Sequence, residues 1–301
     1  MKYLKKIKSL FKNNTIKGLL YIFPAMLILT LFKIYPIIKS FSMAFYTDFD
    51  YLSGEVYERG FDNFQYVLTD PDFYLALKNT FFFVLGVVPL SIIISLGFAI
   101  LLNSKIKLGN FFRSVYFLPF VTSTVALSII WRWIFNKDYG LANYFILLLG
   151  GKKINWLTNP KYTIPILVLF SIWKSMGYKI IIFLAGLQNI DKKYYLAAKI
   201  DGASRLKIFT HITLPLLTPT LFFVSITSII GAFKIFDEVF VLYNTSTGPL
   251  KSGLTIVYYI FNKFYRHWQF SIASAAAVVL FIIILIFTLI QLKISKIKSN
   301  Y

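Results

Sequence analysis

The chain has 301 residues, of which 57% are hydrophobic and only 15% are charged. A soluble domain contains about 45–50% apolar and about 25% charged residues, so this composition favours a protein embedded in a bilayer. The net charge is +20, but the basic residues lie between long apolar runs rather than in one patch, and we expect no nucleic-acid partner. The chain has no cysteine, which excludes disulfides, thiolate metal sites and cysteine nucleophiles.

Six apolar segments reach the roughly 20 residues that a helix needs to cross a bilayer. In chain order, the expected spans are 18–45, 79–104, 114–135, 162–190, 212–236 and 268–292. We therefore expect an all-α polytopic membrane protein with one transmembrane domain at 18–292. A basic tail at 1–17 precedes this domain, and a short tail at 293–301 follows it.

The distribution of lysine and arginine predicts the orientation of these spans. Six spans place both tails on one side, where the connecting segments carry 17 basic and two acidic residues. The other side carries 11 basic and 10 acidic residues. Since cytoplasmic loops are enriched in lysine and arginine, we expect both termini in the cytoplasm. A cleaved signal peptide ending near Ser42-Met43-Ala44 is the alternative, but the apolar region is too long and contains two lysines.

The first outer loop, 47–78, is rich in acids and contains the turn-forming sequences Asp62-Asn63 and Asp70-Pro71-Asp72. We expect short helices there. Several prolines fall in or at the ends of the spans and predict bends rather than breaks. These are Pro24, Pro36, Pro89, Pro119, Pro165, Pro215 and Pro219.

Lys174 and Lys179 lie near the middle of the fourth expected span. Ionisable residues at such positions are costly, so they face a partner helix or a water-filled cavity. Two interpretations stay open: a functional site, or a structural ion pair with Asp237 or Glu238.

The sequence contains no nucleotide-binding phosphate loop, no H-E-x-x-H zinc motif and no G-x-S-x-G nucleophile elbow. We therefore expect no catalytic residues, no metal, no cofactor and no ATP hydrolysis by this chain.

The cytoplasmic segment 191–211 has the pattern of a helix, a turn and a second helix. Tyr194, Ala197, Ala198 and Asp201 share one helical face, and the small side chains would let another surface come close. Gly202 supplies the stop, and Ser204 is placed to cap the next helix. Such a device suits docking; an ordinary interfacial amphipathic helix is the alternative.

Within this segment, Tyr195-Leu-Ala-Ala-x-x-Asp201-Gly202-Ala203 followed by Ile212-x-Leu214-Pro215 resembles the EAA loop of ABC importer permeases. Further similarities to the sugar-permease branch, in particular its maltose-type first subunit, extend along the chain. They are Gly60-Phe-Asp-Asn-Phe, Asn79-Thr80, Phe117-Leu-Pro119, Trp131-Arg-Trp, Tyr139-Gly140, Asn143, Trp173 with Gly177, Ala185-Gly-Leu-Gln188, Thr247-Gly-Pro249 and Phe270-x-x-Ala273-x-Ala275.

The resemblance implies a type I ABC importer permease in a bacterial or archaeal cytoplasmic membrane. It implies four kinds of partner: a second homologous permease, two cytoplasmic ABC ATPase subunits, an extracytoplasmic solute-binding protein and membrane lipid. The solute would be a sugar or oligosaccharide. The expected ATPase-coupling residues are Tyr195, Leu196, Ala197, Ala198, Asp201, Gly202, Ala203 and Pro215.

The coupling loop departs from the family at two positions. Leu196 replaces the glutamate of the EAA triplet, so the family's salt bridge with the ATPase cannot form there. Asp191 stands where a proline usually precedes the loop. The small side chains of the loop and the Asp201 carboxylate remain available for contact with the ATPase.

The resemblance places the substrate path beside Tyr178, with Ser171, Lys174 and Ser175 as hydrogen-bonding neighbours. An aromatic ring stacking on a sugar face is chemically sensible. Glycerol phosphate or a polyol is an alternative solute, and Lys174 would suit an anion. An alternative function is an autonomous secondary transporter that uses Lys174 and Lys179, although paired acids or histidines for proton coupling are missing. The sequence names neither the solute nor the partners.

Overall fold

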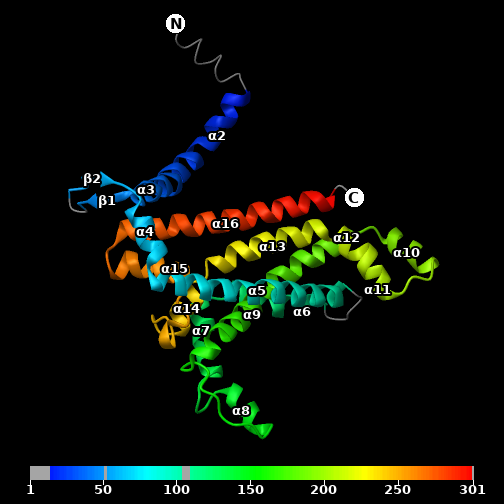
Figure 1. Cartoon of the computed structure of the whole chain (residues 1–301). Coiled ribbons are helices and arrows are strands. Elements are labelled where there is room, and N and C mark those ends of the chain that lie inside the picture. Colours follow the sequence, from blue (N-terminus) through cyan, green and yellow to red (C-terminus); the bar gives the residue numbers. More distant parts are fainter. Residues whose placement is uncertain (1–13, 51–52, 104–108, 300–301) are drawn as a thin grey trace.

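The computed structural model describes residues 14–50, 53–103 and 109–299. Most of the expected tail at 1–17 and the basic residues Lys105 and Lys107 lie outside the described residues. Most of the described chain is helical, and its β-structure consists of one two-stranded antiparallel hairpin (Figure 1). The α-helices are α2 (Asn14–Leu29), α3 (Tyr35–Met43), α4 (Asp62–Thr69), α5 (Pro71–Asn103), α6 (Gly109–Val121), α7 (Thr124–Ile134), α8 (Leu141–Leu148), α9 (Pro160–Gln188), α10 (Lys192–Ile200), α11 (Arg205–Ile208), α12 (Leu214–Leu216), α13 (Thr218–Phe233), α14 (Asp237–Leu242), α15 (Ile256–Phe261) and α16 (Phe270–Ser299).

Four continuous helical segments are long and apolar enough to cross a membrane: Lys17–Met43, Pro71–Asn103, Pro160–Gln188 and Phe270–Ile294. Two bent pairs bring the number to six if each pair is one span. Arg113–Val121 and Thr124–Ile134 meet at 104°, and Arg205–Leu216 and Thr218–Phe233 meet at 67°. These six segments correspond in order to the six expected spans.

The two strongest bends lie beside prolines, where we expected bends without breaks. α6 ends two residues after Pro119, and the fifth segment breaks at Leu217, between Pro215 and Pro219. Proline has no N–H, so residue 219 cannot donate to the carbonyl of residue 215, and one rung of the helical ladder is missing. Pro24, Pro89 and Pro165, in contrast, lie inside continuous helices.

The segment 47–78, the expected first outer loop, differs from the short helices expected there. β1 (Tyr46–Phe49) pairs with β2 (Val56–Arg59), and only α4 is helical before α5. α5 begins at Pro71 rather than near residue 79, because the Asp70 carboxylate accepts a hydrogen bond from the Asp72 N–H at 2.9 Å and proline is favourable in a first turn.

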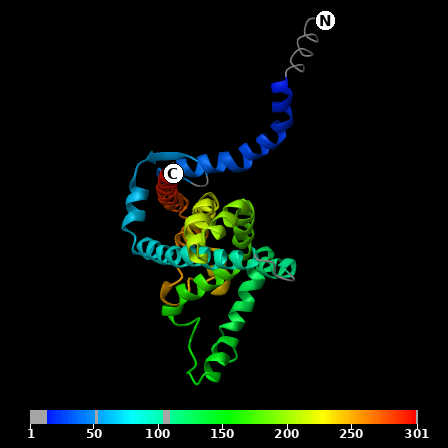
Figure 2. The ribbon, with the colours of Figure 1, turned by 90° about the vertical axis from the view of Figure 1, so that its right-hand side faces the viewer.

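α5 and α9 pack along each other and form the centre of the bundle, with α6 and α13 beside them. α16 packs on α13, α15 and α3. In Figures 1 and 2, α2 leads away from this bundle, and no residue in the apolar window of Lys17–Met43 is buried. Apart from the contact of α3 with α16, the first span therefore has its apolar surface free for lipid or for a partner subunit.

Buried amides hold the segments between the long helices in place. The Asn79 side chain donates to the carbonyls of Lys251 and Leu254, at 3.2 and 3.0 Å. The Asn143 amide makes four hydrogen bonds, two of them to the backbone of Ile154 and one from the Trp156 indole. A buried amide stabilises a fold only when it is satisfied in this way, so these positions fix the loops around the bundle.

Candidate functional site

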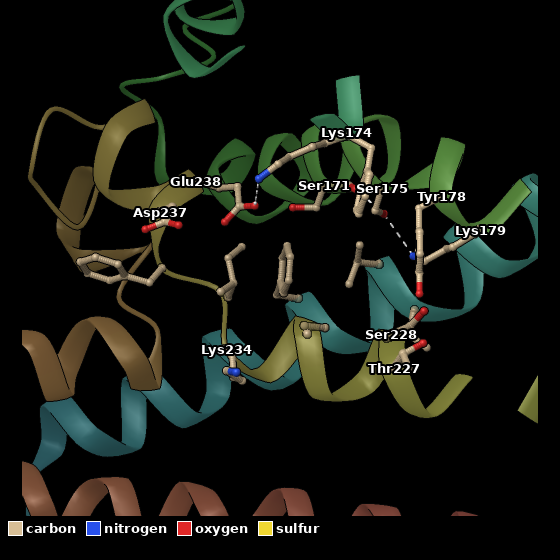
Figure 3. Close-up of a pocket in the computed structure, with 18 residues that line it drawn as sticks. Ser171, Lys174, Ser175, Tyr178, Lys179, Thr227, Ser228, Lys234, Asp237 and Glu238 are labelled. Carbon is tan, nitrogen blue, oxygen red and sulfur yellow. Dashed lines mark hydrogen bonds and ion pairs between the residues drawn. The ribbon is translucent and has the colours of Figure 1, made fainter. Parts of the chain in front are cut away.

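A cavity of about 390 Å³ opens in the middle of the helical bundle, within the range of small-molecule sites (Figure 3). α9 forms one wall, and α5, α6, α13 and the start of α14 contribute the others. Its polar lining residues are Ser171, Lys174, Ser175, Tyr178, Lys179, Thr227, Ser228, Lys234, Asp237 and Glu238. All four residues expected in the substrate path from the sequence lie in this lining.

The four residues meet because they occupy one helical face. Positions 171, 174, 175 and 178 are spaced as neighbours on the surface of α9. On an adjacent face, Gly177 lets α6 approach closely, because a Cβ atom there would lie 2.0 Å from the carbonyl oxygen of Tyr116. This close approach brings Phe120 of α6 against Tyr178.

Tyr178 has one ring face covered. Its ring stacks on Phe120 with 4.9 Å between centroids and 15° between planes. Tyr178 is half-buried and lines the cavity, so the rest of the ring is available to a bound molecule.

Lys174 forms a structural ion pair, which is one of the two interpretations that the sequence left open. Its ammonium forms an ion pair with Glu238 at 3.0 Å and donates to the Thr124 hydroxyl at 2.6 Å. The pair joins α9 to α14, and the side chains of both ions are less than one fifth exposed. Lys174 therefore does not offer the free charge for an anionic solute that the sequence suggested.

Lys179 is different, because among the described residues it has no carboxylate partner. It is 7% exposed, and its ammonium donates to the hydroxyls of Ser91 at 2.6 Å and Ser175 at 3.1 Å. Figure 3 shows this ammonium at the end of the cavity where Ser228 and Thr227 of α13 lie.

The segment 191–211, expected from the resemblance to be the coupling loop, has the expected helix, turn and helix. The Asp191 carboxylate caps α10 by accepting from the Lys193 N–H at 2.9 Å, and this bond holds the pKa of Asp191 below its ordinary value. Ser204 caps α11. Gly202 has φ of +71°, and the Ala203 N–H bonds back to the Ala198 carbonyl, which is a Schellman turn. The predicted stop and cap are thus confirmed.

The orientation of α10 corrects one part of the docking interpretation. Ala198 is 8% exposed, and the half-buried Tyr195 hydroxyl lies 3.2 Å from that of Thr213, so these two residues face the protein itself. Leu196, Ala197 and Asp201 are exposed. Ala198 therefore lets α10 pack closely on its own chain rather than on another subunit. Of the other expected ATPase-coupling residues, Gly202 and Pro215 are exposed and Ala203 is half-buried.

Several lining residues were missed in the sequence. Phe120, Thr227, Ser228 and Lys234 come from segments more than 40 residues away from Tyr178 in the chain. The only local signal was a cluster of small and polar residues, Thr227, Ser228 and Gly231, inside an apolar span.

Comparison with known proteins decides the family. The family of "binding-protein-dependent transport system inner membrane component" proteins matches residues 88–298. The chain belongs to this family. It is therefore a multi-helix inner membrane component of a transport system, and the family consists of transport proteins rather than enzymes.

Curated relatives cover nearly the whole chain. The arabinooligosaccharide permease protein AraP of Bacillus subtilis is 40% identical over 96% of this chain and 91% of its own length. The lactose permease protein LacF of Rhizobium radiobacter is 35% identical, covering 94% and 95%. The trehalose/maltose permease protein MalF of Thermococcus litoralis is 32% identical, also covering 94% and 95%.

A solved structure confirms the fold. A chain of a bacterial alginate ABC transporter, crystallised in complex with an alginate pentasaccharide-bound periplasmic protein, superposes with a TM-score of 0.80. It is 23% identical and covers 97% of this chain and 96% of that chain. The type I ABC importer permease fold expected from the sequence is thus confirmed.

Proposed function

We propose that this chain is one of two permease subunits of an ATP-driven importer that takes up a sugar or oligosaccharide. An extracytoplasmic binding protein delivers the solute, and two cytoplasmic ABC ATPase subunits supply the energy. The relatives named above are sugar permeases over nearly their whole lengths, which is the observation that carries the proposal.

The central cavity is the proposed solute path. Its polar lining, combined with the part of the Tyr178 ring that Phe120 does not cover, suits a molecule with many hydroxyls and an apolar ring face. Hydroxyl groups of the solute would find partners among the serine and threonine side chains of α9 and α13.

The turn between α10 and α11 is the proposed ATPase contact. Leu196, Ile200 and Leu206 are 59%, 86% and 72% exposed, so this loop presents apolar side chains to the solvent. Apolar side chains that are unsuited to water favour a protein partner. Because Leu196 replaces the family glutamate, the contact would depend on shape and apolar burial more than on an ion pair.

Gentle solubilisation of the tagged chain from its native membrane tests the proposal. We expect a second six-span permease and an ATPase to co-purify, and sugar uptake by the reconstituted complex to require ATP. Recovery of this chain alone, with transport in the absence of ATP, would instead support the autonomous secondary transporter. The Lys174–Glu238 ion pair already weakens that alternative, since it leaves Lys174 without a free charge for a relay.

A further inference from the structure

Fixed charge in the central cavity is unevenly compensated. Three lysines and two carboxylates line it, and Lys174 and Glu238 neutralise each other in an ion pair. Lys234 and Asp237 lie on the opposite side of the cavity from Lys179 in Figure 3, and both are exposed. Lys179 is thus the buried cation of the lining that has no carboxylate partner among the described residues.

A buried cation without a counter-charge is costly, even when hydroxyls solvate it. An ammonium has three donors, and the serine hydroxyls of residues 91 and 175 use two of those of Lys179. One donor remains. The hydroxyl oxygens of Ser171 and Ser228 are also buried without a hydrogen-bond partner among the described residues, and both side chains line the same cavity.

We propose that the cavity binds a sugar that carries a carboxylate, and that Lys179 supplies the positive charge that the carboxylate meets. The inference rests on the proposed function, because it names the class of sugar that would pass the same cavity. The free donor of Lys179 and the unpaired hydroxyls on α9 and α13 then receive partners from one ligand, while Tyr178 contacts the sugar ring.

A single negative charge fits the lining better than a phosphate. A phosphate monoester carries a charge of about −1.5 to −2 at neutral pH and is usually bound by several cations or by bidentate arginine. The cavity lining contains no arginine, and of its two lysines without a carboxylate partner among the described residues, Lys179 and Lys234, only Lys179 is buried. A uronic-acid residue therefore matches the available charge, whereas glycerol phosphate does not.

A purely structural role for Lys179 makes a different prediction. Its bond to Ser91 joins α5 to α9, so the lysine also acts as a brace between two spans. Loss of a brace would slow the uptake of every solute alike. Loss of a charge partner would reduce only the uptake of the acidic sugar.

The test is uptake by the complete importer reconstituted with its binding protein and ATP. Two disaccharides are compared that differ only in a terminal uronate or hexose. For each protein, the uptake rate of the acidic disaccharide is divided by that of the neutral one. Comparing this ratio between a variant and the wild type removes the preference of the binding protein, which is the same in both. We expect Lys179→Gln to lower this ratio about ten-fold, which corresponds to about 1.4 kcal/mol. Lys179→Arg should retain the preference, and Ser91→Ala should leave the ratio unchanged.

The other possible results separate failure of the inference from failure of the proposed function. An unchanged ratio in Lys179→Gln, or wild-type uptake of the neutral sugar alone, would overturn the inference and leave the proposed function intact. Stronger competition by glycerol 3-phosphate than by the uronate would overturn the assignment to a carboxylate. If the wild type takes up neither sugar while ATP is present, the proposed sugar import itself fails. Uptake of the neutral disaccharide by Lys179→Gln shows that the variant is folded.

Discussion

Tyr178 presents one usable ring face to the cavity, because Phe120 covers the other. A one-sided platform of this kind binds a sugar by stacking on a single face, whereas an open ring in a channel would contact sugar on both faces. Most of the contact area belongs to the aromatic ring and little to the hydroxyl.

Two substitutions of Tyr178 therefore distinguish the contribution of its ring to sugar uptake from that of its hydroxyl. We expect Tyr178→Ala to reduce sugar uptake at least ten-fold, and Tyr178→Phe to keep most of it, with the amount of assembled complex unchanged. Initial uptake rates, measured beside the yield of co-purified ATPase, check this. Wild-type uptake by Tyr178→Ala would remove this residue from the solute path.

Gly202 closes the turn between α10 and α11, the proposed ATPase contact, with a left-handed backbone, and a Cβ atom there would meet nothing within 4 Å. The obstacle to substitution is therefore backbone strain rather than space, and asparagine tolerates this conformation far better than valine. We expect Gly202→Val to separate ATP hydrolysis from uptake by displacing the turn, and Gly202→Asn to behave nearly as the wild type. The ratio of sugar imported to ATP hydrolysed is the measurement. Normal coupling in Gly202→Val would refute the docking role of the turn.

Among the elements, the start of α5 and the region of α15 are joined by a charged and aromatic cluster. The Asp70 carboxylate, before α5, accepts from the Tyr259 hydroxyl at 2.8 Å and pairs with Lys263 at 3.1 Å. Burial alone would raise the pKa of Asp70, but the hydrogen bond from Tyr259, together with bonds from the Asp72 backbone and Lys263, holds it below its ordinary value. The cluster connects the start of α5 to α15 and to the short π-helix Asn262–Arg266 that follows it.

A carboxylate with a lowered pKa stabilises the fold at pH values above the ordinary pKa of about 3.9, and this contribution is lost as the pH falls through the folded-state value. We expect Asp70→Asn to cost about 1–2 kcal/mol at neutral pH, since hydrogen bonds to a charged group are removed. The difference from the wild type should shrink below about pH 4. Thermal unfolding of the purified protein across pH 3–7 measures it.

Asp62, which is exposed at the start of α4, supplies the control. Asp62→Asn should change stability by less than Asp70→Asn at every pH. An equal effect of the two substitutions would show that the cluster does not stabilise the packing of α5 against the region of α15.

At the scale of the whole molecule, the positive-inside pattern predicts which face is cytoplasmic, and the absence of cysteine makes the prediction easy to test. Lys152 follows α8, and Lys199 lies on α10; both are exposed. We expect Lys152→Cys to react with a membrane-impermeant maleimide in intact cells, and Lys199→Cys to react only after permeabilisation. The opposite labelling pattern would invert the proposed topology.

The sequence predicts what depends on local pattern. Apolar length predicts six segments, and Gly202 with Ser204 predicts the coupling turn, because caps and stops act within a few residues. The start of α5 was misjudged because Asp70-Pro71 favours both a turn and a helix start. Pairing of Lys174 with Glu238 rather than Asp237 depends on contacts 64 residues apart, which no local signal contains. The inward face of Tyr195 and Ala198 also depends on tertiary packing.

The bend in the fifth segment has a mechanical consequence. One arm, Arg205–Leu216, begins at the turn proposed to contact the ATPase, and the other, Thr218–Phe233, carries Thr227 and Ser228 in the cavity wall. A straight helix that is pushed at one end moves along its own axis. In a helix bent by 67°, a push along the first arm instead moves the second arm sideways. A push from an ATPase on the first arm would therefore swing the second across the cavity, moving the serine and threonine hydroxyls of α13 relative to the lysines of α9. In that arrangement, energy from the cytoplasm would reach the solute as a sideways change in the shape of its binding site.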